Sequence, residues 1–207
     1  MRGKLFTAVV SIGLVLAGSA WAQDRDENWK RCGGSNNLDL SIGACTAIIR
    51  SGQESNDHLA AAFYDRGWDY EHEGQTARAI QDYDQAIKLR PDFAGAYNNR
   101  CWEQAIIGQL QAVLADCNQS LAFQSGNAHF LDSRGFVYLK MKYPMAAIAD
   151  YDAALKIDPK IDTSLYGRGL AEHMKGDIAR GDADIAAAKI ITPKIAAEFI
   201  KWGVSAP

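Results

Sequence analysis

YDRGWDY (64–70) is the first of four similar segments, which continue as NNRCWEQ (98–104), DSRGFVY (132–138) and YGRGLAE (166–172). Their arginines stand at a constant interval of 34 residues: Arg66, Arg100, Arg134 and Arg168. A second series, from AIQDYDQAI (79–87) to GDADIAAAK (181–189), repeats with the same period and carries Asp82, Asp116, Asp150 and Asp184. A fixed period of this length indicates a repeat architecture.

The four copies resemble the tetratricopeptide repeat (TPR), a 34-residue unit of two helices joined by a turn. The first copy carries the TPR motif positions as Phe63, Gly67, Tyr70, Ala79, Tyr83, Ala86 and Pro91. The third copy matches through Leu131, Gly135, Tyr138, Ala147, Tyr151, Ala154 and Pro159. The second and fourth copies are degenerate, with Gln104, Val113, Ser120 and Glu172 off the pattern. Four copies in phase make the resemblance specific.

The resemblance implies an all-α fold: a right-handed superhelical solenoid of TPR helix–turn–helix repeats. We assign the repeats to 60–93, 94–127, 128–161 and 162–195. A single repeat cannot bury its apolar face, so the ends of a solenoid need covers. We expect an N-terminal half-repeat over 38–59 and a C-terminal capping helix over 193–207 that closes the last repeat. A polar arm over 23–37 precedes the half-repeat.

The first residues have the pattern of a secretory signal peptide over 1–22. Arg2 and Lys4 precede an apolar run, and Ala20-Trp21-Ala22 forms the cleavage site. We therefore expect an exported bacterial protein located in the periplasm. The alternatives are extracellular release and an uncleaved N-terminal anchor, although the apolar run is short for a membrane span. After cleavage, no segment is long and apolar enough to span a membrane.

The charge balance argues against two classes of partner. The formal net charge is −3, and removal of Arg2 and Lys4 makes the mature chain more acidic. Because there is also no basic stripe, we do not expect nucleic acid or anionic lipid as the main partner.

The sequence has four cysteines: Cys32, Cys45, Cys101 and Cys117. An even number favours disulfides in an exported chain. In the second copy Cys101 replaces the glycine that marks the close helix crossing of the TPR fold, and Cys117 replaces the large residue on the facing helix. This paired change predicts a disulfide across one helix hairpin. Cys45 takes the equivalent of the Cys117 position in the half-repeat, which leaves Cys32 as its partner. A free buried pair and a redox centre are the alternatives, but no C-x-x-C motif is present.

The repeated arginines stand where the TPR motif usually has leucine, at a position that faces the core. A buried guanidinium without an acceptor costs several kcal/mol, so each arginine needs a partner. We predict a ladder of ion pairs, within or between repeats, that joins Arg66, Arg100, Arg134 and Arg168 to Asp82, Asp116, Asp150 and Asp184. The alternatives are two rows of solvated charges and arginines that face a ligand carboxylate.

No motif for catalysis is found in the sequence. There is no Gly-rich phosphate loop and no G-x-S-x-G motif, and the histidines His58, His72, His129 and His173 lack metal-ligand spacing. We expect no enzyme activity, no cofactor and no metal site. The expected function is a protein–protein interaction module, a scaffold in the cell envelope. The alternatives are an accessory or regulatory subunit of an envelope enzyme or redox system, and a structural spacer.

TPR domains generally bind a partner segment along a concave face lined by their first helices. The residue after the glycine position lies toward that face, and here it is Trp68, Trp102, Phe136 or Leu170. Tyr64 and Tyr166 lie one helical turn earlier, and Asn98, Asn99 and Asp132 add polar groups nearby. We predict that these residues bind a peptide or protein segment with apolar or aromatic side chains. The alternative is that the rings pack between helices as core.

Overall fold

A computed structural model describes residues 24–205, so the expected signal peptide over 1–22 lies outside the described residues. The described part contains helices and no strands, which confirms the all-α fold. A helical segment over 24–31 comes first. The later helices are α2 (Leu38–Ser51), α3 (Asn56–His72), α4 (Thr76–Leu89), α5 (Ala94–Ile106), α6 (Leu110–Phe123), α7 (Ala128–Lys140), α8 (Pro144–Ile157), α9 (Asp162–Lys175), α10 (Ile178–Ile191) and α11 (Ile195–Lys201).

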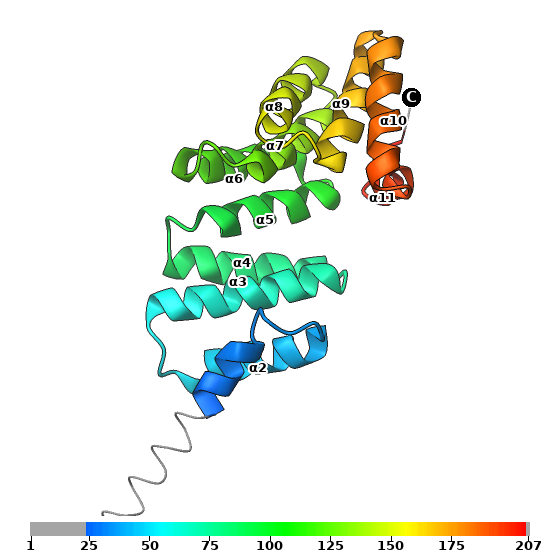
Figure 1. Cartoon of the computed structure of the whole chain (residues 1–207). Helices are drawn as coiled ribbons and strands as arrows, with labels where there is room; N and C mark the ends of the chain where they lie inside the picture. The colour runs from blue at the N-terminus through cyan, green and yellow to red at the C-terminus, as the bar shows by residue number, and fades with distance from the viewer. Residues whose placement is uncertain (1–23, 206–207) are drawn as a thin grey trace, which may run out of the picture.

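The helices pair as hairpins that stack in chain order, which is the arrangement of a TPR solenoid (Figure 1). α3 packs on α4, α5 on α6, α7 on α8 and α9 on α10, one hairpin for each predicted repeat. α2 packs on α3 as the lone helix of the half-repeat. Among the described helices, none is long and apolar enough to cross a membrane.

The turn between the two helices of each repeat needs a left-handed backbone at one position. Gly74, Gly108 and Gly176 provide it, with φ between 72° and 96°. In the third repeat Lys142 takes the same place at φ 60°, the single non-glycine residue with positive φ among the described residues. Pro144 begins α8 two residues later, because its fixed φ suits the first turn of a helix.

The close crossing within each hairpin depends on a glycine facing a large side chain. A Cβ atom on Gly67 would lie 2.8 Å from the ring of Tyr83, and one on Gly135 would lie 2.8 Å from the ring of Tyr151. In the second repeat this contact is replaced by a disulfide between Cys101 and Cys117, whose Cα atoms are 5.4 Å apart. The second disulfide joins Cys32 to Cys45, with a Cα separation of 4.8 Å. The Cys101–Cys117 pairing is the one expected from comparing the repeats, and Cys32 is the partner expected for Cys45.

Each arginine of the ladder binds the aspartate of its own repeat through two hydrogen bonds. In the third repeat Arg134 Nε and Nη2 each lie 2.7 Å from a different oxygen of Asp150. The arginine side chains of the ladder are only 15–24 % exposed, which excludes a row of freely solvated charges. The other three pairs have the same geometry: Arg66–Asp82, Arg100–Asp116 and Arg168–Asp184.

The remaining Nη1 group of each arginine reaches back to the second helix of the preceding unit. Its acceptors, in chain order, are Thr46, Asp84, Asn118 and Asp152, at 2.6–3.0 Å. The ladder therefore has contacts both within and between repeats. Each of the three nitrogens of every guanidinium thus makes one hydrogen bond within the protein, and the paired aspartates already neutralise the charge that a ligand carboxylate would need.

The C-terminal helix α11 caps the last repeat. It turns back at the end of α10 instead of extending the stack (Figure 1). Ile195 and Phe199 are buried, whereas Ile190 on the outer side of α10 is 83 % exposed. α11 packs on α9 and α10, as expected of a helix that caps the last repeat. It also reaches the preceding repeat, because the Phe199 ring contacts Phe136 on α7.

Candidate functional site

The predicted aromatic row lies on the concave face, which is lined by α3, α5, α7 and α9. Its exposure changes sharply along the solenoid: Trp68 is 40 % exposed, whereas Phe136 is 1 % and Tyr166 is 5 % exposed. We call the part around Tyr64 and Trp68 the open half of the face. The part around Trp102, Phe136 and Tyr166 is the filled half.

The filled half is occupied by α11 and the residue that follows it. The Phe199 ring lies 4.7 Å from Tyr166 and 5.8 Å from Phe136, measured between ring centroids. The Trp202 ring lies 5.1 Å from Trp102. The predicted ligand-binding role of Phe136 and Tyr166 is therefore corrected: they belong to the core, because the chain's own C-terminal rings cover them.

Lys140 fixes the end of α11 to the rest of the filled half. Its Nζ donates hydrogen bonds to Trp202 O at 2.7 Å, Ala105 O at 2.7 Å and Ile106 O at 3.1 Å. The last carbonyls of a helix have no partner within the helix, so one ammonium completes the ends of α5 and α11 together. Burial lowers the pKa of Lys140. Sequence analysis missed this residue, since nothing in the repeat pattern marks it.

Two of the predicted polar groups of the face, Asp132 and Asn98, are buried instead of facing solvent. Asp132 is 7 % exposed and accepts hydrogen bonds from Thr163 Oγ1 at 2.8 Å and Ser164 Oγ at 2.5 Å. Burial raises the pKa of Asp132 to about 6. Asn98 is 8 % exposed and donates to Asn99 at 3.2 Å. The expectation that Asp132 and Asn98 contact a ligand is corrected, since burial between helices removes them from the surface.

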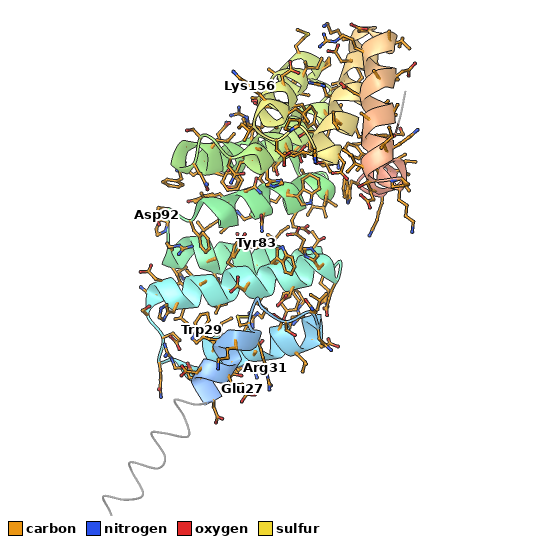
Figure 2. The ribbon with its side chains drawn as sticks, viewed as in Figure 1. Glu27, Trp29, Arg31, Tyr83, Asp92 and Lys156 are labelled. Carbon is orange, nitrogen blue, oxygen red and sulfur yellow. A yellow bond between two sulfur atoms is a disulfide. The ribbon has the colours of Figure 1, made fainter. Side chains whose placement is uncertain are left out.

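Asn99 also links the first two repeats. Its side-chain amide donates to the hydroxyl oxygens of Tyr64 at 3.4 Å and Tyr83 at 3.3 Å. Tyr83 lies in the stack between α4 and α5 (Figure 2) and donates to Glu71 Oε2 at 2.8 Å. This network holds Tyr64 in place at the edge of the open half.

The open half contains a cavity of about 210 Å³ lined by Gly33, Tyr64, Asp65 and Trp68. Trp68 stacks on His72 with ring centroids 3.7 Å apart, and the His72 ring nitrogen Nδ1 lies 2.9 Å from Trp68 O. Gly33 follows Cys32, so the Cys32–Cys45 disulfide holds this wall of the cavity against α2. Gly33 N also donates to Ser41 Oγ on α2 at 2.9 Å.

Carboxylates surround the open half without cationic partners. Burial, assisted by the charge of Asp69, raises the pKa of Asp65 to about 6. Burial also raises the pKa of Glu71 to about 7, although the Tyr83 hydroxyl opposes this shift, and the charge of Glu103 adds to it. Within the described residues, no lysine or arginine forms an ion pair with Asp65, Asp69, Glu71 or Glu103.

Asp69 is the most deeply buried of these acids, with 1 % exposure. Ser41 is the nearest hydroxyl, yet neither carboxylate oxygen of Asp69 has a hydrogen-bond partner of acceptable geometry. Glu103 is 2 % exposed, and its Oε2 also lacks a partner. No group of three or more His, Cys, Asp or Glu in the described part of the chain is arranged to hold a metal ion. The open half is therefore aromatic and negatively charged.

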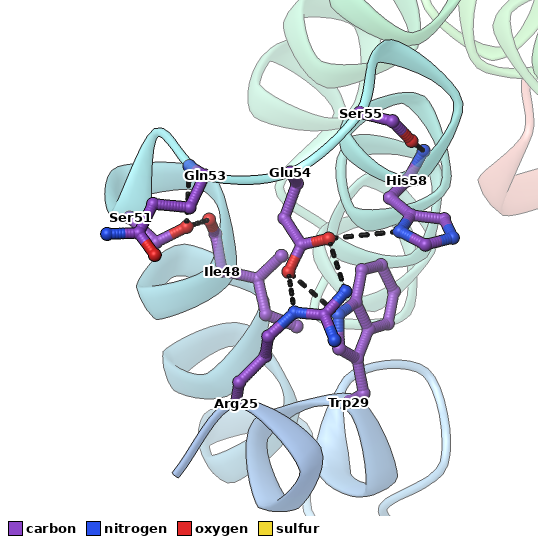
Figure 3. Close-up of polar contacts among 8 residues, drawn as sticks. All are labelled: Arg25, Trp29, Ile48, Ser51, Gln53, Glu54, Ser55 and His58. Atoms are coloured by element: carbon purple, nitrogen blue, oxygen red, sulfur yellow. Dashed lines mark hydrogen bonds and ion pairs between the residues drawn. The ribbon is translucent and has the colours of Figure 1, made fainter. Parts of the chain in front are cut away.

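The N-terminal arm is ordered by Glu54, which sequence analysis also missed. Arg25 Nε and Nη2 donate to its two carboxylate oxygens at 2.5 and 2.9 Å, and Trp29 Nε1 donates at 3.2 Å (Figure 3). His58 Nδ1 lies 3.0 Å from Glu54 Oε2. The hydrogen bond from Arg25 lowers the pKa of Glu54 to about 2. This contact fixes the start of the arm to the loop before α3, and the Cys32–Cys45 disulfide fixes its end beside the cavity.

Comparisons with known proteins agree with the architecture. Models of the tetratricopeptide repeat match residues 60–93 and 128–161, the two copies that follow the motif closely. The chain therefore contains TPR repeats, an architecture whose extended concave surfaces serve for binding.

Solved structures with the same fold cover most of the chain. MamA from Desulfovibrio magneticus RS-1 superposes with a TM-score of 0.68 at 18 % identity, over 84 % of this chain and 95 % of that chain. A tetratricopeptide repeat protein from Parabacteroides merdae gives a TM-score of 0.66 at 19 % identity, over 87 % of this chain and 74 % of that one. At this level of identity the similarity establishes the fold alone.

Two curated relatives share part of the sequence. Hsc70-interacting proteins 1 and 2 of Drosophila melanogaster are each 31 % identical to it over 105 residues. The aligned region is 51 % of this chain and spans about a quarter (26 %) of the length of those proteins.

Proposed function

We propose that this protein is a non-catalytic protein–protein interaction module of the bacterial cell envelope, which binds a segment of a partner protein on the open half of its concave face. The observation that carries this proposal is the contrast in exposure along one row of equivalent positions. Trp68 stands 40 % exposed beside a cavity, whereas Phe136 and Leu170 at the same repeat position are each 1 % exposed.

An exposed tryptophan on a fixed helical scaffold is a typical anchor for a protein partner. Trp68 is held by its stacking on His72, and the cavity wall opposite is held by the Cys32–Cys45 disulfide. Little side-chain freedom would be lost on binding, which favours affinity. The export signal expected over 1–22 and the two disulfides support an oxidising envelope compartment, with the periplasm as the proposed location.

Site-specific photo-cross-linking in the producing cell tests this proposal. A photoreactive residue at position 68 is expected to yield a discrete protein adduct in the envelope fraction. The same residue at Ile157, an exposed apolar position on α8, serves as the matched control and is expected to give none. Adducts of equal yield at both positions, or none at position 68, would reject the open half as the docking surface.

A further inference from the structure

The cavity of the open half has the chemistry of a site for a single organic cation. Its volume of about 210 Å³ is below the roughly 300–1,000 Å³ of pockets that take drug-sized ligands. Two aromatic side chains, Tyr64 and Trp68, and one carboxylate, Asp65, line it. An aromatic face attracts a cation within about 6 Å of the ring, and a carboxylate supplies the opposite charge.

We propose that this cavity binds the side chain of a lysine or arginine from the partner segment, with Asp65 pairing its charge and Trp68 and Tyr64 enclosing its aliphatic part. This proposal rests on the proposed function, because it assumes that a protein segment reaches the open half. It adds the chemical class of the residue that is recognised.

The second observation is the state of Asp69, which lies one helical turn beyond Asp65 and on the same side of α3. At 1 % exposure its two carboxylate oxygens have no hydrogen bond of acceptable geometry, and the Ser41 hydroxyl is the group close enough to act on its pKa as a donor. The other buried aspartates of the repeats are satisfied: Asp82, Asp116 and Asp150 each bind an arginine, and Asp132 binds two hydroxyl groups. Asp69 instead has no cationic ion-pair partner among the described residues, and its charge acts on Asp65, whose pKa it raises.

Alternative ligands fit the cavity less well. A metal ion needs several converging ligands, and the described residues contain no such group. A carboxylate from a partner's chain end would be repelled by Asp65 and Asp69. A purely apolar side chain would bury Asp65 without a counter-charge, which is unfavourable.

The protonation of Asp65 gives the site a characteristic pH dependence. The charge that acts on it is that of Asp69 on α3, while Gly33 and the disulfide sulfur of Cys32 lie against it from the arm. With its pKa raised to about 6, the Asp65 carboxyl is largely ionised at pH 7.5 and largely neutral at pH 5. Cation binding should therefore weaken by about tenfold from pH 7.5 to pH 5.

Titration with blocked amino acids tests the proposal without knowledge of the partner. The probes are N-acetyl-lysine amide and N-acetyl-arginine amide, with N-acetyl-norleucine amide as the uncharged match, followed through the Trp68 indole NMR signal. We expect saturable shifts with both cations at millimolar concentration and none with norleucine. Asp65→Asn should weaken the binding at least tenfold, while Asp92→Asn, at an exposed site labelled in Figure 2, should not change it.

Norleucine binding as tightly as lysine, or full cation binding by a folded Asp65→Asn protein, would overturn the proposal. Thermal melting shows whether each variant is folded. The two proposals can fail separately. A cross-linked partner at position 68 that persists in Asp65→Asn would reject the cation site and keep the proposed function. Cation titration that succeeds while position 68 captures no partner would support the site and reject the proposed function.

Discussion

The two halves of the concave face are built from the same repeat positions but have different environments. Trp68 in the open half and Phe136 in the filled half both follow the glycine position of their repeats, 68 residues apart. Phe136 is core because Phe199 and Trp202 cover it, whereas Trp68 is 40 % exposed among residues 24–205. A residue's place in a repeat therefore fixes which face it lies on, but a later element decides whether that face is surface.

The largest expected difference between the halves is in stability. Phe136→Ala should destabilise the protein by about 3–5 kcal/mol, because it leaves a cavity among buried rings. Trp68→Ala should cost only about 0.5 kcal/mol, as is usual for an exposed position. Urea unfolding followed by circular dichroism measures both. Similar losses for the two variants would mean that the open half is also core, and Trp102→Ala should resemble Phe136→Ala.

The ion-pair ladder should behave alike in both halves. Arg134→Leu alone should cost about 2–3 kcal/mol, somewhat less than a fully buried broken pair, because Asp150 keeps an uncompensated charge. The double variant Arg134→Leu/Asp150→Leu should recover most of this loss. The same cycle on Arg66 and Asp82 is the matched comparison, and the free energies of unfolding give the coupling. Additive single effects in either cycle would contradict a buried ladder.

Lys140→Met should separate α11 from the filled half. Loss of an ammonium bound to three carbonyls should cost about 2 kcal/mol and expose Trp202 to quenchers. Hydrogen exchange should speed up in α11 and stay unchanged in α3. Lys156→Met, at an exposed position labelled in Figure 2, is the control and should change neither. Unchanged exchange in α11 after Lys140→Met would show that ring packing alone holds the helix.

The smallest expected effect depends on pH and concerns the open half. The folded pKa of Glu71 is about 7 against an ordinary value of 4.5, so its neutral form is favoured. The contribution of neutral Glu71 to the free energy of unfolding is therefore fully present below pH 4.5 and is lost as the pH rises through 7.

Glu71→Gln keeps an acceptor for the Tyr83 hydroxyl. It cannot ionise, so it removes the stability loss that ionisation of Glu71 causes at high pH. We expect it to raise the free energy of unfolding by about 1 kcal/mol at pH 8, after discounting for partial exposure, and to change nothing at pH 4.5. Thermal unfolding at the two pH values measures the effect, with Asp92→Asn as an exposed control. A gain of the same size at both pH values would exclude an ionisation effect.

Sequence reasoning could predict the features that repeat and missed those that occur once. The period of 34 predicts the hairpins, the ladder and the position of the Cys101–Cys117 pair, because comparison between copies shows which positions face each other. The returning α11 and the Lys140 contact have no counterpart in other repeats. Their roles depend on packing between distant segments, which periodicity does not report.

The Nη1 hydrogen bonds of the ladder, which join each repeat to the one before it, differ in charge along the solenoid. The acceptor is charged between repeats one and two (Asp84) and between repeats three and four (Asp152), but neutral between repeats two and three (Asn118). Lys140 adds a second contact between repeats two and three. It belongs to repeat three and donates to the carbonyls of Ala105 and Ile106 in repeat two. α11 and Lys140 therefore connect the two full repeats whose ladder contact has a neutral acceptor. Release of α11 would let the two pairs of repeats unfold as separate cooperative blocks.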